Sequence, residues 1–278
     1  PPVPRPTPAR SQHGGVGGRA KQTNGHVAGV FLLLLGLGFL LTACGTPVTA
    51  APAPRAEDWW QQRFNAMNER VRQGNVGMIF MGDSITHGWE GAGASVWNTY
   101  YAGRNAVNLG IGGDRTQEVL WRLDNGNVDG ISPRVAVVHI GTNNLQNTAR
   151  EIALGVEAVV KTLRCKLPTT RILLLAIFPR GDVGEEYRQR LEDASARFSR
   201  LACDPMVDYM DIGSVFLDAN GVLPRSIMPD LLHLSEEGYQ RWADAIEPRI
   251  ADLLAGKESA IRPGTAGLSG LFWESFLQ

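Results

Sequence analysis

Small and polar residues that could carry out acyl transfer follow three apolar stretches of the chain, and a fourth group lies near the C-terminus. Ser84 follows Gly-Asp, glycines are concentrated at residues 110–114, and Asn143 follows Gly-Thr. Further along, Asp230 precedes His233 by three positions. Acyl transfer needs a nucleophile, N–H donors for an oxyanion and a base that a carboxylate orients. These residue types therefore predict serine-based acyl transfer.

The histidine that activates the serine is the next question, because a serine hydroxyl is a weak nucleophile without a base in hydrogen-bonding distance. His233, with Asp230 three residues before it, is one candidate for an oriented base. His87, three residues after Ser84, is the alternative base, but its place in the turn after the serine favours a structural role. His139 lies in an apolar stretch, and we expect it in the core.

Strand-like and helix-like segments alternate through the body of the chain, which predicts a parallel sheet covered on both faces. The expected architecture is an α/β fold, a three-layer α/β/α sandwich with about five parallel strands. Because ligands bind beyond the carboxyl ends of such strands, the polar segments above should meet there. The predicted strands are 76–81, 106–109, 135–140, 172–177 and 206–210, and the predicted helices are 59–71, 115–123, 152–163, 185–201 and 235–254.

The chain resembles the SGNH hydrolases, also called the GDSL esterase family, with the nearest likeness to the catalytic subunits of intracellular platelet-activating-factor acetylhydrolase. The resemblance extends from residue 76 to about residue 250. One departure is Ile85, where the family's Gly-Asp-Ser-Leu motif has leucine. The stretches that carry the resemblance are 108–114, 119–123, 141–144, 178–181 and 230–234.

The resemblance implies a role for each residue of the predicted site. Ser84 would be the nucleophile, His233 its base and Asp230 the carboxylate that orients the imidazole. The oxyanion hole would comprise the backbone N–H groups of Ser84 and Gly113 and the side-chain amide of Asn143. Glycine lets the backbone approach the substrate closely, and an amide is a neutral donor. Neither a metal nor an organic cofactor is needed for this chemistry.

Other polar residues near these segments have two readings each. Asp83 is a second carboxylate partner or, as favoured, an acceptor for the backbone of its own loop. Asp114 and Arg115 clamp the substrate, or the aspartate caps the next helix. Arg180 lines the pocket or ties a loop in place. The candidates for a tryptophan that stacks on a sugar, rather than packing in the core, are Trp59, Trp60 and Trp97.

The predicted function is hydrolysis of short-chain, acetyl-like carboxylic esters through an acyl-serine intermediate. The substrate is expected to be a small acyl ester, either an acetylated sugar or a lipid. Alternatives with the same triad are a carbohydrate O-deacetylase and a lysophospholipase or thioesterase. A non-catalytic module that binds in the cell envelope is the remote option, disfavoured because such a module has no chemical need for the full residue set.

Composition limits the remaining classes. The 278 residues carry 27 basic and 28 acidic side chains, so the net charge of -1 argues against a nucleic-acid partner. Three cysteines are too few for a disulfide scaffold, and the lack of a C-x-x-C pair argues against a structural zinc site. Whether Cys165 and Cys203 pair is left open. A homodimer is left open as well: the resembling subunits dimerise, but no exposed apolar stripe in this sequence indicates a dimer.

The first residues predict a targeting signal rather than part of the folded domain. Residues 1–43 combine a basic start with an apolar run and resemble a bacterial lipoprotein signal, with Cys44 as the lipidated residue. A membrane-spanning anchor is the alternative. We expect a lipid-anchored tether over 44–56, a hydrolase domain over 57–256 and a C-terminal tail over 257–278. The enzyme would then lie in the cell envelope, on the periplasmic or extracellular side.

Overall fold

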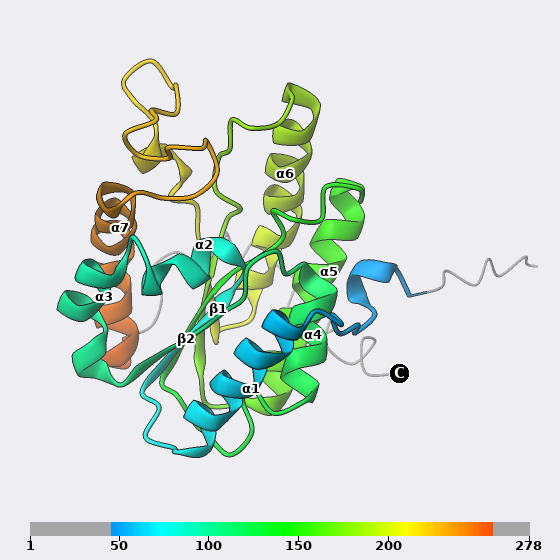
Figure 1. Cartoon of the computed structure of the whole chain (residues 1–278), viewed down its shortest axis with the longest axis vertical. Coiled ribbons are helices and arrows are strands. Elements are labelled where there is room, and N and C mark those ends of the chain that lie inside the picture. The colour runs from blue at the N-terminus through cyan, green and yellow to red at the C-terminus, as the bar shows by residue number, and fades with distance from the viewer. Residues whose placement is uncertain (1–45, 258–278) are drawn as a thin grey trace, which may run out of the picture. The chain divides into compact units, whose positions relative to one another are not determined.

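The computed structural model describes residues 46–257 (Figure 1). The expected leader, the lipidation at Cys44 and residues 258–278 of the expected tail lie outside the described residues. Five parallel strands form one sheet in the order β2-β1-β3-β4-β5, as the strand and helix alternation predicts. The strands are β1 (Met78–Gly82), β2 (Ala106–Gly110), β3 (Val135–His139), β4 (Arg171–Leu175) and β5 (Val207–Met210).

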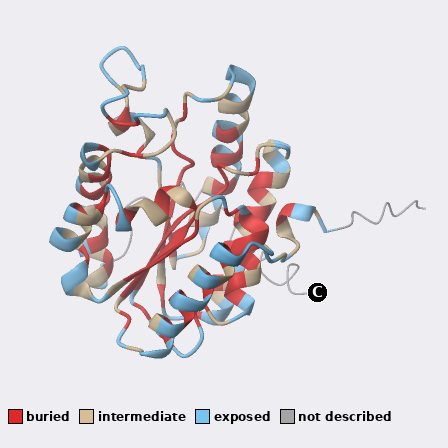
Figure 2. Cartoon of the chain, in the orientation of Figure 1, coloured by how far each residue is buried: buried red, intermediate tan, exposed pale blue. Residues whose placement is uncertain are grey.

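Both faces of the sheet are covered, which explains why the central strands are apolar throughout rather than alternating. Every residue of β1 and β3 is buried, and the strands form the buried centre in Figure 2. Helices α1, α4, α5 and α6 pack on one face, and α2, α3 and α7 pack on the other. The helices are α1 (Asp58–Arg72), α2 (Ser84–His87), α3 (Ala94–Tyr100), α4 (Thr116–Asp124), α5 (Ala149–Lys166), α6 (Glu185–Phe198) and α7 (Glu236–Leu254).

Local capping fixes where the longest helices begin. The Ser235 hydroxyl accepts a hydrogen bond from the N–H of Gly238 at 3.2 Å, at the start of α7. Thr148 and Glu151 form a capping box at the start of α5, which satisfies N–H groups that have no partner within the helix. Among residues 46–257, no helix is both long and apolar enough to cross a bilayer.

Residues 46–57 pack against the domain, which differs from the tether that the Pro/Ala composition suggests. Thr49, in the 3-10 helix η1 (Val48–Ala50), is buried, and its hydroxyl donates to the carbonyl of Glu151 at 2.6 Å. Thr116 Oγ1 donates to the carbonyl of Thr49 at 2.7 Å. These hydrogen bonds run to α4 and α5, so the segment is held on the same face of the sheet as those helices.

Candidate active site

The loops at the carboxyl end of the sheet bring the predicted catalytic side chains together. Ser84 is the first residue of α2, directly after β1, and its Oγ lies 2.9 Å from Nε2 of His233. Nδ1 of His233 lies 2.6 Å from Oδ2 of Asp230. A continuous hydrogen-bonded series therefore links hydroxyl, imidazole and carboxylate, although Ser84 and His233 are 149 residues apart in sequence.

Asp230 is held as an anion by the groups around it. Burial alone would raise its pKa, but the His233 side chain and the backbone N–H groups of His233 and Leu232 outweigh that cost. The pKa of Asp230 is thereby lowered to about 2. Because Asp230 accepts a hydrogen bond from Nδ1–H of His233, Nε2 carries no proton and keeps its lone pair for the serine hydroxyl.

A strained backbone position lies between Asp230 and His233, the two predicted catalytic residues. Leu231 has a φ of +65°, in the left-handed region that residues with a side chain rarely adopt. Its carbonyl accepts a hydrogen bond from the N–H of Gly181 at 2.8 Å, which fixes the turn on the loop after β4. Such strain persists where the surrounding structure holds it, and here it turns Asp230 and His233 toward one another.

The loop that begins α2 holds Ser84 through Asp83. Oδ1 of Asp83 accepts from the N–H of Ile85 at 2.9 Å, so this carboxylate serves its own loop, as favoured from the sequence. Asp83 is fully buried, and its Oδ2 has no hydrogen-bond partner among the described residues. Burial raises the pKa of Asp83 to about 7.

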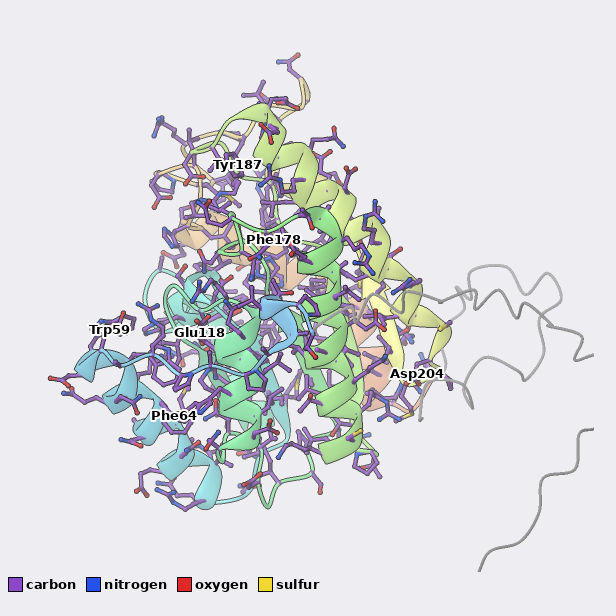
Figure 3. All side chains as sticks on the ribbon, turned by 90° about the vertical axis from the view of Figure 1, so that its right-hand side faces the viewer. Trp59, Phe64, Glu118, Phe178, Tyr187 and Asp204 are labelled. Atoms are coloured by element: carbon purple, nitrogen blue, oxygen red, sulfur yellow. The ribbon has the colours of Figure 1, made fainter. Side chains whose placement is uncertain are left out.

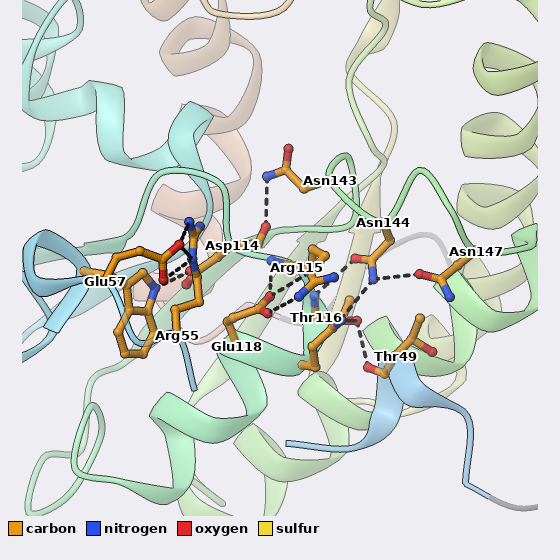
Figure 4. Close-up of polar contacts among 12 residues, drawn as sticks. Thr49, Arg55, Glu57, Asp114, Arg115, Thr116, Glu118, Asn143, Asn144 and Asn147 are labelled. Carbon is orange, nitrogen blue, oxygen red and sulfur yellow. Dashed lines mark hydrogen bonds and ion pairs between the residues drawn. The ribbon is translucent and has the colours of Figure 1, made fainter. Parts of the chain in front are cut away.

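The loop after β2 lies directly beside the nucleophile and carries Gly113. A Cβ atom added at Gly112 would lie 3.9 Å from Cβ of Ser84, so a side chain at this position would contact the nucleophile. Gly113 has a φ of +74°, which favours glycine there. Nδ2 of Asn143, from the loop after β3, donates to the carbonyl of Asp114 at 2.9 Å (Figure 4). One N–H of the Asn143 amide is thereby anchored, and the second is left for a substrate.

Asp114 neither clamps a substrate nor caps α4, because its side chain is fully buried in an ion pair. Oδ2 accepts from Nε of Arg122 at 2.9 Å, and Oδ1 accepts from Nε1 of Trp60 at 2.6 Å. Arg122 also donates to the carbonyls of Leu109 at 3.0 Å and Gly82 at 3.2 Å. This single guanidinium thus links the ends of β1 and β2 to the loop that carries Gly113.

Two residues that sequence reasoning did not single out fix this loop further. Oδ1 of Asn144 accepts from the N–H of Thr116 at 3.1 Å and so caps α4 from the loop after β3 (Figure 4). Arg122 shares the inward face of α4 with Val119 and Leu123. That i, i+3, i+4 spacing was the available signal for a buried arginine.

Arg180 ties two loops together rather than lining a pocket. It is 5% exposed, donates from Nη1 to the carbonyl of Thr142 at 2.9 Å, and pairs with both carboxylate oxygens of Asp182.

His139 is a core histidine whose Nε2 accepts from the N–H of Phe178 at 3.2 Å, and burial lowers its pKa to about 3. Burial, with the nearby charge of Arg63, also lowers the pKa of His87.

The described residues contain no group of three or more His, Cys, Asp or Glu side chains placed to hold a metal ion. Cys165 and Cys203 are free and exposed thiols, so they do not form a disulfide with one another in this structure.

A family model described as the GDSL-like lipase/acylhydrolase family matches residues 80–241, which include the whole Ser-His-Asp arrangement. The chain belongs to this family. As a GDSL-like acylhydrolase, it is a serine-dependent carboxylic ester hydrolase. The sheet and helices described above are the fold of the solved family members.

Among curated relatives, the platelet-activating factor acetylhydrolase IB subunit alpha2 of Rattus norvegicus is 32% identical over 210 residues. The match covers 74% of this chain and 89% of the rat protein. A GDSL-like lipase from Bacteroides thetaiotaomicron has a similar structure, with a TM-score of 0.54 at 17% identity, covering 69% of this chain and 97% of that one. An acetylxylan esterase from Geobacillus stearothermophilus, solved as a catalytic mutant, gives a TM-score of 0.52 at 17% identity, covering 64% and 94%.

Proposed function

We propose that this acylhydrolase removes short acyl groups, acetyl above all, from carboxylic esters through an acyl intermediate on Ser84. The observation that carries the proposal is the 2.9 Å contact between Ser84 Oγ and His233 Nε2, with Asp230 on the opposite nitrogen of the ring. The acetyl group is supported by the acetylhydrolase activity that the name of the rat relative states.

In the first half of the reaction, His233 Nε2 takes the proton of Ser84 Oγ while that oxygen attacks the ester carbonyl carbon. The carbonyl oxygen becomes an oxyanion, which accepts hydrogen bonds from the N–H groups of Ser84 and Gly113 and from the free N–H of Asn143. His233 then protonates the alcohol oxygen as its bond to carbon breaks. The alcohol leaves, and the acyl group stays on Ser84.

In the second half, a water molecule attacks the acyl-Ser84 carbonyl and gives its proton to Nε2 of His233. The oxyanion collapses, the bond to Oγ breaks, and His233 returns the proton to Ser84 as the carboxylic acid departs. Asp230 stays ionised throughout, because its pKa of about 2 lies far below the working range, and it stabilises the imidazolium.

The proposal extends to location on the basis of sequence alone. The Leu-Thr-Ala-Cys motif over residues 41–44 supports lipidation of Cys44 and an enzyme anchored in a bacterial cell envelope. Mass spectrometry of the membrane fraction tests this directly: a diacylglyceryl group on Cys44 is the expected finding, and an unmodified, unprocessed N-terminus would contradict it.

Steady-state hydrolysis of p-nitrophenyl acetate tests the catalytic assignment. Replacing Ser84 with alanine removes the nucleophile, so kcat should fall by about 10⁴-fold or more, with an unchanged circular dichroism spectrum. His87→Ala is the matched control, because that imidazole has no part in the proposed steps, and it should retain most of the activity. Undiminished activity in Ser84→Ala would refute the triad.

Acyl preference is tested with the p-nitrophenyl acetate, butyrate, octanoate and laurate esters. The highest kcat/KM is expected for acetate. A preference for octanoate or laurate would refute the short-acyl assignment while leaving the serine chemistry intact.

A further inference from the structure

A polar cleft of about 470 Å³ opens beside the loop that carries Gly113. One wall is the N-terminal segment at residues 53–57, and the other is formed by Gly113, Arg115 and Glu118 (Figure 4). The catalytic steps above assign no part to this cleft, although Gly113 is shared between it and the proposed oxyanion hole.

Arg55 brings the cleft into contact with the reaction centre. Its Nη1 lies 2.7 Å from the position that a Cβ atom would take at Gly113, and it donates to the carbonyl of Gly112 at 3.3 Å. A Cβ atom added at Gly112 would in turn lie 3.9 Å from Cβ of Ser84. A molecule seated next to the Arg55 guanidinium therefore lies one short loop away from the ester carbonyl that Ser84 attacks.

The size of the cleft indicates which half of the ester it receives. An acetyl group presents only a methyl beyond the carbonyl carbon, so it needs no extended subsite. A volume of about 470 Å³ matches a group of several rings or a comparable polar body. The alcohol portion is the part of a short-chain ester that can be this large.

The charges around the cleft are balanced, which argues against an anionic leaving group. Arg55 pairs with Glu57 at 2.6 Å, and Arg115 pairs with Glu118 at 2.6 Å (Figure 4). A phosphate would have to displace a carboxylate from its guanidinium. Hydroxyl groups, by contrast, can donate to the carboxylates and accept from the guanidinium groups without breaking either pair.

The apolar part of the lining is too small for a lipid chain. It consists of Ala53, Pro54 and Ala56, which offer no long hydrophobic wall. Trp59 adds an aromatic surface next to Arg55, whose guanidinium carbon lies 5.0 Å from the ring centroid. Trp59 is 48% exposed, on the first turn of α1 (Figure 3). A large exposed ring beside paired polar groups suits a pyranose, which has an apolar C–H face and a polar rim.

The N-terminal segment is held firmly enough to form a wall. The N–H of Ala53 donates to the carbonyl of Gln117 at 3.0 Å, and Nε2 of Gln61 donates to the carbonyl of Arg55 at 2.5 Å. With Thr49 buried between α4 and α5, the backbone on both sides of Arg55 is fixed. A preformed wall lowers the entropy cost of ordering a bound sugar.

We propose that this cleft is the leaving-group subsite of the esterase, that it takes a neutral, hydroxyl-rich carbohydrate, and that Arg55 selects it. The proposal rests on the short-acyl esterase function above and deepens it by naming the alcohol half. The substrate class is thus an O-acetylated saccharide.

The test compares kcat/KM for acetylated xylo-oligosaccharides with kcat/KM for p-nitrophenyl acetate, whose alcohol half is a single flat ring. Arg55→Ala should lower the ratio of the saccharide kcat/KM to the p-nitrophenyl acetate kcat/KM by about tenfold or more. The variant loses the hydrogen bonds between the guanidinium and the sugar hydroxyls, and p-nitrophenyl acetate has no such hydroxyls to lose. Trp59→Ala should lower the same ratio through lost stacking. Arg72→Ala is the matched control, an exposed arginine paired with Glu69 in the last turn of α1, and should leave the ratio unchanged.

Each outcome separates the subsite from the catalytic proposal. If the wild-type enzyme hydrolyses p-nitrophenyl acetate but not acetylated saccharides, or prefers an acetylated glycerophospholipid, the carbohydrate subsite is refuted and the esterase stands. If it hydrolyses none of these esters, the proposed function itself fails. An unchanged ratio in Arg55→Ala and Trp59→Ala, with both variants shown to be folded by thermal melting, also refutes the subsite.

Discussion

Two carboxyl groups near the nucleophile have pKa values displaced in opposite directions, because they differ in burial and in the number of hydrogen bonds that they accept. Asp230 is an exposed residue that collects three hydrogen bonds, from the His233 ring and from two backbone N–H groups, which lower its pKa to about 2 despite partial burial. Asp83 receives one backbone hydrogen bond and is fully buried, and burial raises its pKa to about 7. Only Asp230 is thus a dependable anion at neutral pH.

The raised pKa of Asp83 predicts a pH-dependent stability. An unfolded aspartate releases its proton near pH 3.9, whereas folded Asp83 keeps it to about pH 7. The folded state therefore holds more protons over this interval, and the contribution of Asp83 to the unfolding free energy falls as pH rises. Between about pH 5 and pH 8 this contribution should fall by about 2–3 kcal/mol.

Urea denaturation of Asp83→Asn at both pH values checks this expectation. Asparagine keeps an oxygen for the N–H of Ile85 and removes the titration, so the variant should lose less stability than the wild type between the two pH values. Equal losses in the two proteins would show that the Asp83 carboxyl is already ionised in the fold.

At the scale of elements, α4 and two strand ends depend on one buried guanidinium. Arg122 donates to the carbonyl of Gly82 at the end of β1 and to that of Leu109 near the end of β2, and it neutralises Asp114, whose own carbonyl anchors Asn143. The ion pair therefore keeps in register the separate loops that carry the proposed oxyanion donors. Removing one partner of such a buried pair leaves the other charge buried without compensation, which destabilises the fold more than replacing both partners with apolar residues.

Arg122→Met should accordingly destabilise the domain by about 3–5 kcal/mol, because it leaves the Asp114 carboxylate buried without its partner. Arg72→Met is the exposed control and should cost less than about 1 kcal/mol. Urea denaturation of the wild type and both variants at neutral pH measures the two losses in unfolding free energy. A cost for Arg122→Met no larger than that of the control would mean that the buried network does not hold the loops.

At the scale of the whole described chain, the N-terminal segment belongs to the catalytic domain. Its hydrogen bonds from Thr49 to Glu151, from Thr116 to Thr49 and from Ala53 to Gln117 join it to two helices. The proposed subsite therefore combines a loop at the carboxyl end of the sheet with a segment that precedes the first helix in sequence.

A chain that begins at residue 57 should therefore be less stable than one that begins at residue 46, by about 1–3 kcal/mol for the lost hydrogen bonds. Thermal and urea unfolding of the two proteins measure the difference. The shorter chain also lacks Arg55, so its preference for acetylated saccharides should fall as well. Equal stability of the two chains would show that residues 46–56 only rest on the surface.

Sequence alone could predict the elements and the chemistry. Apolar periodicity reports which face of a segment is buried, and that signal predicted the five strands and the long helices to within a few residues. The same signal is missing from α2 and α3, because helices of four and seven residues span too few turns to show a period. Ser84, Asp230 and His233 could be named because the motifs around them resemble those of the GDSL esterases, which implies a role for each.

The tertiary structure decided what no local pattern contains: the strand order, the carbonyl partners of Arg122 and the seating of Arg55 against Gly113. Each depends on contacts between segments dozens of residues apart. From the sequence, a charged side chain is expected in solvent unless packing brings it a partner, as it brings the carbonyl of Gly82, 40 residues earlier, to Arg122. A proline-rich segment likewise looks like a tether until neighbouring helices offer it hydrogen bonds. The free energy of such contacts arises only when the chain folds, so the sequence by itself cannot display them.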